Sequence, residues 1–324
     1  MNTFGRIFRI TLYGESHGPS VGVIVDGCPP GIDLSEADFI HDLFRRKSGA
    51  TGTTQRVEDD IPEIISGVYQ GKTTGAPLNI SFRNKDVRPE DYNIHTTVPR
   101  PGHADYTAHV KYKGFQDPRG GGHFSGRLTV CLVAAGIIAK KILPNANIQA
   151  ILAEAGGTKD IEKAVAKAVA EKNSVGGIVE CRATGLPAGL GEPFFDSVES
   201  LISHIVFAIP AVRGIEFGSG FKAAAMTGSE HNDSILPDGK TATNHAGGIN
   251  GGITNGNELV FSVAVKPASS IALPQQSIDL QTNNPVSLEI QGRHDACIAL
   301  RVPVIVEALT AIVLADCLLM MGKV

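Results

Sequence analysis

The sequence has no tryptophan, and its 29 lysines and arginines are outnumbered by 33 aspartates and glutamates, giving a formal net charge of −4. The positive residues form no basic stripe along the chain. Binding to a phosphate backbone needs clustered Lys and Arg, and binding to single strands needs aromatic platforms. Nucleic acid is therefore not expected as a main partner.

Cysteine is scarce, and none of it occurs as a C-x-x-C pair. The five residues are odd in number, widely spaced and mostly set in apolar surroundings: Cys28, Cys131, Cys181, Cys297 and Cys317. Such cysteines are typical of small buried hydrophobic positions. We predict five reduced thiols in the core.

The sequence also lacks the apolar segments that a leader or a membrane span would need. Residues Met1 to Gly14 contain no apolar block like that of a signal peptide, and the apolar run from Leu128 to Ala139 is too short to cross a bilayer. The protein is therefore expected to be soluble and cytoplasmic, with no membrane partner.

Several motifs of common enzyme classes are missing. The sequence contains no H-E-x-x-H, no G-x-x-x-x-G-K-[ST] and no strand–G-x-G-x-x-G–helix unit, so a nucleotide kinase or a Rossmann dehydrogenase lacks its usual loop. A metal hydrolase is the least favoured of the functions considered. His103 and Asp105 stand two apart on a predicted loop, a spacing that can bind a metal but commonly does not. We expect no metal.

Glycine, by contrast, is abundant. The 37 glycines fall in short clusters such as Gly120-Gly121-Gly122 and Gly247-Gly248, which predict tightly turned backbone of the kind that can surround a ligand. With 324 residues, 42% of them hydrophobic, the chain is long enough to fill a large core. No linker-like stretch divides it, which favours one compact unit or two closely packed halves.

Local patterns predict strands that alternate with helices. Short β-branched segments bounded by Gly, Pro or Asn predict six strands, at Val21 to Val25, Glu63 to Val68, Leu78 to Phe82, Gly177 to Ala183, Glu258 to Val265 and Val286 to Ile290. Amphipathic helices are predicted after the Ser35-x-x-Asp38 capping box and over Lys159 to Lys172, the second with Ile161, Val165, Ala168 and Val169 on its apolar face. Two further helices are apolar nearly all round and should be buried, Arg127 to Leu143 and Val302 to Met321.

An internal repeat indicates how these elements are organised. A strand leads into Gly27-Cys28-Pro29-Pro30-Gly31-Ile32, and another leads into Gly185-Leu186-Pro187-Ala188-Gly189-Leu190, both of the form G-x-P-x-G-apolar. Each half also ends in a polar glycine cluster followed by a buried helix. A chance match of two Pro/Gly turns is the alternative.

The repeat predicts an α+β fold with duplicated strand–helix halves, in which antiparallel β-sheets sandwich a central layer of buried helices. We infer a single catalytic domain over residues 1–324, with pseudo-symmetric halves of about 1–150 and 175–324. A short peripheral helical segment joins them. The ligand site is expected where loops of both halves converge.

Polar residues gather at the glycine-rich turns, where a ligand can reach them. His17 and His103 are candidate general acids or bases, because histidine exchanges protons near neutral pH. A hydrogen-bonded structural role is the alternative for each. Arg100, Arg127 and Arg293 each lie beside a histidine cluster and suit oxyanions, whereas Arg119 alone is better explained by a surface ion pair.

Considered together, these clusters resemble one family over nearly the whole chain. The motifs occur in this order: F-G-x-x-F-R-x-T-x-x-G-E-S-H-G from Phe4, V-D-G-C-P-P-G-I from Val25, T-T-G-A-P-L from Thr73, R-P-G-H-A-D-Y-T from Arg100, R-G-G-G from Arg119, L-P-A-G-L-G-E-P from Leu186, N-H-A-G-G-I-x-G-G-I from Asn244 and G-R-H-D-x-C from Gly292. In this order and number they are similar to the chorismate synthases.

The resemblance implies a lyase of aromatic amino acid biosynthesis, acting at the last common step of the shikimate pathway. Its members carry out an anti-1,4 elimination of phosphate and a proton from 5-enolpyruvylshikimate 3-phosphate. The reaction needs reduced FMN although it is redox-neutral. The family also implies a homotetramer, with NADPH as a possible reductant used directly or through a separate flavin reductase.

The resemblance also implies roles for individual residues. His17 would protonate or stabilise the leaving phosphate, and His103 would serve protonation of the reduced flavin. Ser16, Ser125 and Asp295 would lie close to flavin and substrate, with Asp295 assisting proton removal through the flavin N5. Arg46, Arg100 and Arg127 would bind the anionic substrate or NADP. FMN contacts are expected from His123, Phe124, Ser125, Ala211, Gly251, Lys266, Pro267, Ala268, Ser269, Ser270 and Arg293.

The sequence departs from the family pattern in two places. Where the family usually has R-S-S-A-R-E-T, this chain has His123 to Thr129, so histidine replaces a flavin-contacting arginine and phenylalanine replaces one serine. The loop Gly49 to Thr54 also lacks an arginine that the family commonly carries. A relative that binds flavin but has lost turnover is therefore the second functional alternative.

Overall fold

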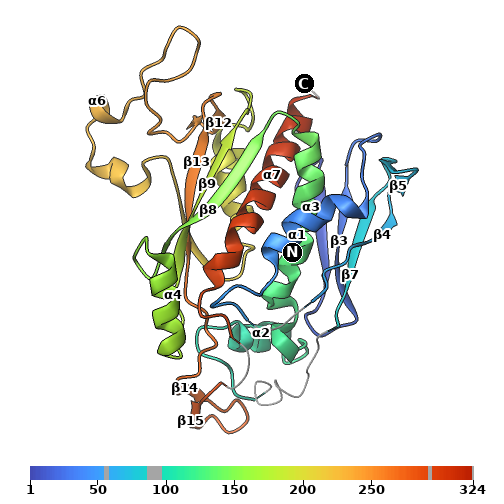
Figure 1. Ribbon diagram of the computed structural model, residues 1–324, viewed down its shortest axis with the longest axis vertical. Coiled ribbons are helices and arrows are strands. Elements are labelled where there is room, and N and C mark those ends of the chain that lie inside the picture. The colour runs from blue at the N-terminus through green and yellow to red at the C-terminus, as the bar shows by residue number, and fades with distance from the viewer. Residues whose placement is uncertain (55–57, 86–96, 291–293, 323–324) are drawn as a thin grey trace.

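The computed structural model describes residues 1–54, 58–85, 97–290 and 294–322. Figure 1 shows two antiparallel β-sheets on opposite sides of a helical layer, whose main members are α3 (Thr129–Ile142) and α7 (Val302–Met321). The predicted arrangement of antiparallel sheets around buried helices is confirmed. An arm that carries α6 (Gly228–His231) projects from one end of the molecule (Figure 1).

Each sheet turns one face to the helices. The first has the order β1-β2-β3-β7-β4 and the second β10-β13-β9-β8, and neighbouring strands pair antiparallel. Along β13 every second side chain is buried, as expected for a strand that packs on one face. The strands are β1 (Thr3–Phe4), β2 (Arg9–Gly14), β3 (Ser20–Asp26), β4 (Glu63–Ser66), β7 (Leu78–Arg83), β8 (Asn147–Ala155), β9 (Gly177–Thr184), β10 (Val212–Phe217) and β13 (Leu259–Val265).

Smaller elements surround this framework. Two-stranded ribbons are formed by β5 (Val68–Tyr69) with β6 (Lys72–Thr73), β11 (Ile249–Asn250) with β12 (Ile253–Thr254), and β14 (Gln275–Ile278) with β15 (Pro285–Leu288). The remaining helices are α1 (Ile40–Arg46), α2 (Asp105–Tyr112), α4 (Ile161–Ala170), α5 (Val198–Val206) and the 3-10 turns η1 (Glu36–Phe39), η3 (Arg119–Phe124), η4 (Gly126–Leu128), η5 (Phe194–Asp196), η6 (Gly220–Ala225) and η7 (Ile298–Arg301).

Two sequence-based expectations need correction. Asp105 was expected on a loop, but it is the first residue of α2, which the sequence patterns did not predict. Val169 was expected on the buried face of α4, yet 49% of it is exposed, and Ala164 is buried instead. The helix is rotated so that its small alanines, rather than Val169, approach the sheet.

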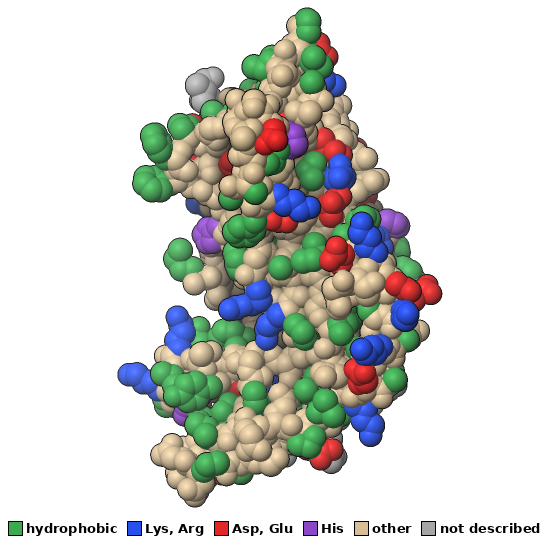
Figure 2. Space-filling model, turned by 90° about the vertical axis from the view of Figure 1, so that its left-hand side faces the viewer, with side chains coloured by type: hydrophobic (Ala, Val, Ile, Leu, Met, Phe, Trp, Pro, Cys, Tyr) green, Lys and Arg blue, Asp and Glu red, His purple; other side chains and the backbone are tan. Residues whose placement is uncertain are grey.

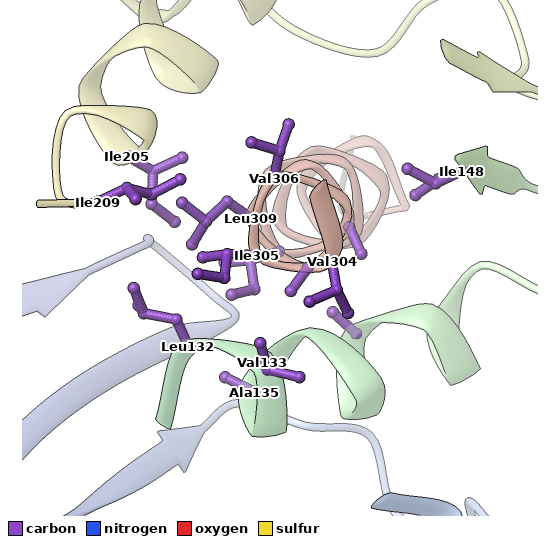
Figure 3. Close-up of a cluster of buried hydrophobic side chains, with 14 of the residues drawn as sticks. Leu132, Val133, Ala135, Ile148, Ile205, Ile209, Val304, Ile305, Val306 and Leu309 are labelled. Carbon is purple, nitrogen blue, oxygen red and sulfur yellow. The ribbon is translucent and has the colours of Figure 1, made fainter. Parts of the chain in front are cut away.

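The core is centred on α3 and α7, which are buried along most of their length. A Cβ on Gly136 of α3 would lie 2.3 Å from the Cβ of Ala308 on α7, so the two helices cross at a distance that only glycine permits. Figure 3 shows the side chains that gather around this crossing, among them Leu132, Val133, Ile148, Ile205, Ile209, Val304, Ile305, Val306 and Leu309.

Apolar helices of this length also occur in membranes. The stretches Arg119–Ile142 and Ile298–Met321 are long and apolar enough to span a bilayer, but 78% of the most apolar window of each is buried inside the protein. They are the core helices of the sandwich. All five cysteines are free and buried, as predicted. Burial raises the pKa of Cys131, Cys181 and Cys317 to about 12, which keeps these thiols protonated.

Charged side chains also connect α1, α3 and α7. We call Asp42, Arg45, Lys140 and Glu307 the core cluster. The Nη1 and Nη2 atoms of Arg45 each donate to the Glu307 carboxylate at 2.7 Å, and Lys140 Nζ donates to Asp42 at 2.6 Å. Glu307 also accepts the backbone N–H of Ala150 on β8. Two positive and two negative groups are therefore matched within the helical layer.

The two G-x-P-x-G turns are held by the same set of hydrogen bonds. Thr73 Oγ1 accepts from Ile32 N at 3.0 Å and donates to Pro29 O at 2.7 Å. In the second turn Thr254 Oγ1 accepts from Leu190 N at 2.9 Å and donates to Pro187 O at 2.8 Å. This likeness in three dimensions supports our proposal that the chain consists of two equivalent halves.

Candidate active site

A cavity of about 740 Å³ opens at the N-terminal ends of α3 and α7. Its walls come from the end of α1, the chain after α5, and loops around residues 100–104, 120–128 and 266–270. Cavities of roughly 300–1,000 Å³ are typical of small-molecule and cofactor sites. Helix N-termini carry partial positive charge, so this position favours anionic ligands.

The glycine triplet gives two histidines room at this cavity. Gly120, Gly121 and Gly122 all have positive φ, at 58°, 81° and 52°. A Cβ on Gly120 would lie 2.3 Å from the imidazole of His17, and one on Gly121 would lie 3.2 Å from that of His103. The triplet therefore allows both rings to lie directly against its backbone.

His103 belongs to a hydrogen-bonded group at the start of α2. Its Nδ1 lies 2.6 Å from Asp105 Oδ1, and Arg100 donates to the same carboxylate through Nε at 2.7 Å and Nη2 at 2.9 Å. Burial alone would raise the pKa of Asp105, but hydrogen bonds from Arg100 and His103 hold it well below its ordinary value. With Nδ1 donating to Asp105, Nε2 is the His103 nitrogen that can exchange a proton.

His17 lies deeper than His103. It is 7% exposed, its Nδ1 is 3.3 Å from Ser16 Oγ, and Ser16 is fully buried. Neither residue lines the cavity, whereas Gly120, which covers the His17 ring, does. The structure thus places this pair one backbone layer behind the cavity wall.

Arg46, Asp60 and Arg127 form what we call the pocket triad. Arg46 Nη2 donates to Asp60 Oδ2 at 2.6 Å, and Arg127 Nη1 donates to Asp60 Oδ1. All three line the cavity although their side chains are 7%, 0% and 3% exposed. Burial lowers the pKa of Arg46, although the negative charge of Asp60 partly opposes this shift. For Asp60, burial would raise the pKa, but the two guanidinium charges lower it below its ordinary value.

Asp295, the predicted assistant in proton removal, also lines the cavity. It accepts from the Thr54 backbone N–H at 3.0 Å and from Arg301 Nη2 at 3.2 Å. Arg301 also lines the cavity, and its Nε is buried without a hydrogen-bond partner among the described residues, as is Arg46 Nε. Buried donors of this kind are matched by an acceptor when an anionic ligand binds.

The residues that replace family positions also lie at the cavity. His123 Nδ1 is 2.9 Å from Gly14 O, and its Nε2 is 3.1 Å from Asn2 Oδ1. Phe124 is 37% exposed and lies near the ring of Tyr112. Both line the cavity together with Ser125. His123 thus ties the N-terminal strand to the glycine loop.

Residues predicted to contact flavin come mostly from one loop. Ala211 and the run Lys266, Pro267, Ala268, Ser269 and Ser270 line the cavity. Lys266 Nζ donates to Gly102 O at 2.7 Å, and Ser269 Oγ donates to the same oxygen, which fixes this loop beside His103. Arg293 lies outside the described residues.

Gly251 is the one predicted flavin contact in the described chain that does not line the cavity. It lies in the exposed turn between β11 and β12. The next residue, Gly252, accepts the Val198 N–H at the start of α5, whereas the cavity is lined by the end of that helix. Gly251 is therefore separated from the cavity by the length of α5.

Sequence reasoning missed three residues that organise this site. Asp105 could have been found from its H-x-D spacing to His103, which suits a carboxylate that orients an imidazole. Asp60 ends the acidic run Glu58-Asp59-Asp60, a pattern that ordinarily marks a solvated surface. Arg301 opens a buried helix and carries no motif of its own. Among the described residues, no group of three or more His, Cys, Asp or Glu is placed to hold a metal ion.

Fold and site together define a class of protein, a mixed α/β enzyme with a cationic pocket for a small anionic ligand. A family model described as chorismate synthase matches residues 8–319. The chain is 60% identical over 322 residues to the chorismate synthase of Chitinophaga pinensis, covering 99% of this chain and 97% of the relative. Identity to the chorismate synthase of Polynucleobacter asymbioticus is 45% over 342 residues, covering 97% and 91%.

A crystal structure of chorismate synthase matches this fold with a TM-score of 0.76 at 26% identity, covering 98% of this chain and 93% of the other. The chain belongs to the chorismate synthase family, and its activity is that of this lyase of aromatic amino acid biosynthesis. The family resemblance inferred from the motifs is thus confirmed. Members of the family are soluble biosynthetic enzymes, in agreement with the burial of the two apolar helices.

Proposed function

We propose that the chain eliminates phosphate and a proton from 5-enolpyruvylshikimate 3-phosphate by an anti-1,4 route, with reduced FMN as cofactor. The observation that carries the proposal is the gathering of buried Arg46, Arg100 and Arg127 around one cavity at two helix N-termini. The substrate carries a phosphate and two carboxylates. Guanidinium groups and helix N-termini both favour such oxyanions.

In this proposal His103 handles protons at the flavin side of the cavity. Asp105 fixes its ring through Nδ1, so that Nε2 can donate or accept a proton. His17 serves the leaving phosphate. Because the His17 ring lies directly against Gly120, we propose that the phosphate end of the substrate lies at the glycine triplet.

The side of the cavity next to His103 suits a flavin. Ala211, Phe124 and the loop from Lys266 to Ser270 offer apolar surface and hydroxyl groups, in a cavity large enough for two small molecules of this class. When bound, reduced FMN supplies transient electron donation without net redox change. We expect Ser125 and Asp295, which line the cavity, to contact both ligands; Arg301 donates to the Asp295 carboxylate.

Other parts of the proposal concern reduction and assembly. NADPH is the proposed reductant, used directly or through a separate flavin reductase, in the cytoplasm. A homotetramer is proposed as the working form, and large exposed aromatics such as Phe194, Phe195 and Phe221, at 85%, 91% and 85% exposure, support burial against other copies. Gly251 would contact flavin only in such a neighbouring copy.

The test is phosphate release from 5-enolpyruvylshikimate 3-phosphate, measured anaerobically with chemically reduced FMN. We expect turnover that requires reduced flavin and falls about a hundredfold or more in His17→Ala and in His103→Ala, the scale of lost acid–base help. His41→Ala is the matched control, since the His41 side chain is 82% exposed on α1 and outside the cavity.

Flavin binding without turnover in the parent protein would contradict the proposal. It would favour a relative that has kept the cavity but lost catalysis, with the His123 and Phe124 replacements as the first suspects. Turnover that is lost on adding a chelator and independent of flavin would instead favour a metal hydrolase.

A further inference from the structure

Asp60 has the most constrained position of any acidic residue at the cavity. Its side chain is fully buried and accepts from both Arg46 and Arg127. Its backbone φ is +50°, in the left-handed region that side chains other than Asp and Asn rarely adopt. Its neighbour Asp59 is half-exposed and pairs with Lys85 on the surface. The chain thus turns sharply to bury one of two adjacent aspartates.

The contacts of the two arginines show what this aspartate does. Arg46 is further held only by Thr129 Oγ1 at 3.3 Å, and its Nε lacks a partner among the described residues. Arg127 is held by Asn84 Oδ1 at 3.0 Å. Among the described residues, Asp60 is the acceptor that both guanidinium groups share, and each of its oxygens accepts from one of them.

Charge gives a second argument. Two other arginines at the cavity are each paired with one carboxylate, Arg100 with Asp105 and Arg301 with Asp295. In the pocket triad, two cations share one anion. Two bare guanidinium groups so close together in a buried site would repel each other strongly, whereas two carboxylates would cancel the positive field. A single carboxylate leaves one unit of positive charge facing the cavity.

We propose that Asp60 is a positioning residue, which fixes the spacing of the Arg46 and Arg127 guanidinium groups and limits the surplus charge of the triad to one. This inference rests on the proposed function, because it assumes that these arginines bind the anionic substrate. Asp60 itself contacts the arginines rather than the reacting atoms. Its negative charge weakens the binding of anions, whereas its positioning of the two arginines favours catalysis.

The test is Asp60→Asn, because asparagine keeps the shape and tolerates the left-handed backbone. Removal of the negative charge should tighten the binding of inorganic phosphate, measured by calorimetry without flavin, by about tenfold or more. The loosened arginines should lower kcat about tenfold or more while KM for the substrate stays level or falls. A merely structural role would lower the active fraction and leave the phosphate Kd unchanged.

Two controls isolate the charge. Asp59→Asn alters the adjacent exposed aspartate, and Asp42→Asn alters a buried aspartate of the core cluster; both should leave the phosphate Kd within about twofold of the parent. The rebalanced double variant Asp60→Asn/Arg127→Met restores one surplus charge. It should return the phosphate Kd toward the parent value while kcat stays low.

Three results would overturn the inference: an unchanged phosphate Kd in Asp60→Asn, an unchanged kcat, or a failure of both the single and the rebalanced variant to fold. The last would show that Asp60 serves folding regardless of charge. Since phosphate binding needs neither flavin nor turnover, the phosphate Kd and folding results are independent of the parent assay that decides the proposed function.

Discussion

Arg45 and Arg46 are neighbours on α1, yet their guanidinium groups join different charge clusters. Successive residues of a helix point about 100° apart, so Arg45 reaches the core cluster and Arg46 reaches the pocket triad. The core cluster balances two cations with two anions, while the triad sets two cations against one. The carboxylates of both clusters are buried, and both clusters connect α1 to the neighbourhood of α3.

The difference separates a structural site from a binding site. A balanced buried cluster has no charge left for a ligand, and its long-range field is weak. An unbalanced one is costly in the free protein and becomes favourable when an anion arrives. Burial alone would not have distinguished the two, since Glu307 and Asp60 are 3% and 5% exposed.

The largest effect on stability is expected from the balanced side. Glu307→Gln removes a buried carboxylate that accepts two hydrogen bonds from Arg45 and one from the Ala150 N–H, and should lower the free energy of unfolding by about 3 kcal/mol, the scale of lost charge-assisted hydrogen bonds. Urea unfolding at pH 7 measures this. Glu180→Gln, which breaks a solvent-exposed pair with Arg182, should cost about 1 kcal/mol or less. Equal losses in the two variants would remove the distinction between buried and exposed pairs.

The next effect should appear in activity. Arg46→Lys removes the planar fork that Asp60 orients, and we expect kcat/KM to fall about a hundredfold, equivalent to about 2.7 kcal/mol. Steady-state phosphate release measures it. Arg45→Lys is the matched control on the adjacent residue, expected to reduce stability while kcat/KM stays within about threefold. A similar loss of kcat/KM in both would mean that the two clusters act as one.

Sequence patterns were sufficient to predict the helices and strands whose hydrophobic pattern is strong. The two apolar helices, α3 and α7, and the strands β3, β7, β9 and β13 lie where their residues predicted them. The patterns missed β2, β8, β10 and α2. In α2 the polar sequence Asp105 to Tyr112 carries no clear apolar face, because it packs through little more than Ala108.

In the site, too, some residues could be predicted from the sequence and others could not. Glycine-flanked polar motifs located His103, Arg100 and Arg127, since a loop motif keeps its residues close together in space. The partners that orient these residues come from elsewhere: Asp60 lies 67 positions before Arg127. Such pairings depend on how the sheet and helices pack, so one sequence contains no local signal for them.

The smallest expected effect is a difference in acid sensitivity. Burial would raise the pKa of Asp42 and of Asp60, but Lys140 and the arginines lower both below the ordinary 3.8. A carboxyl with a depressed pKa binds fewer protons than in the unfolded chain, so its stabilisation is complete above its ordinary pKa and is lost as the pH falls toward its folded pKa.

Unfolding free energies between pH 7 and pH 3 should therefore be flat with respect to these two groups down to about pH 5, then decline. The decline should be shallower in Asp60→Asn and in Asp42→Asn, by about 1.4 kcal/mol for each unit of pKa depression that the parent carboxyl has. If phosphate binds at the triad, it should make the decline shallower only where Asp60 is present, because protonation of Asp60 tightens phosphate binding and bound phosphate therefore raises the folded pKa of Asp60 toward its unfolded value. If the curves of unfolding free energy against pH are parallel for the parent and Asp60→Asn, with and without phosphate, the charge of Asp60 does not affect anion binding in the cavity.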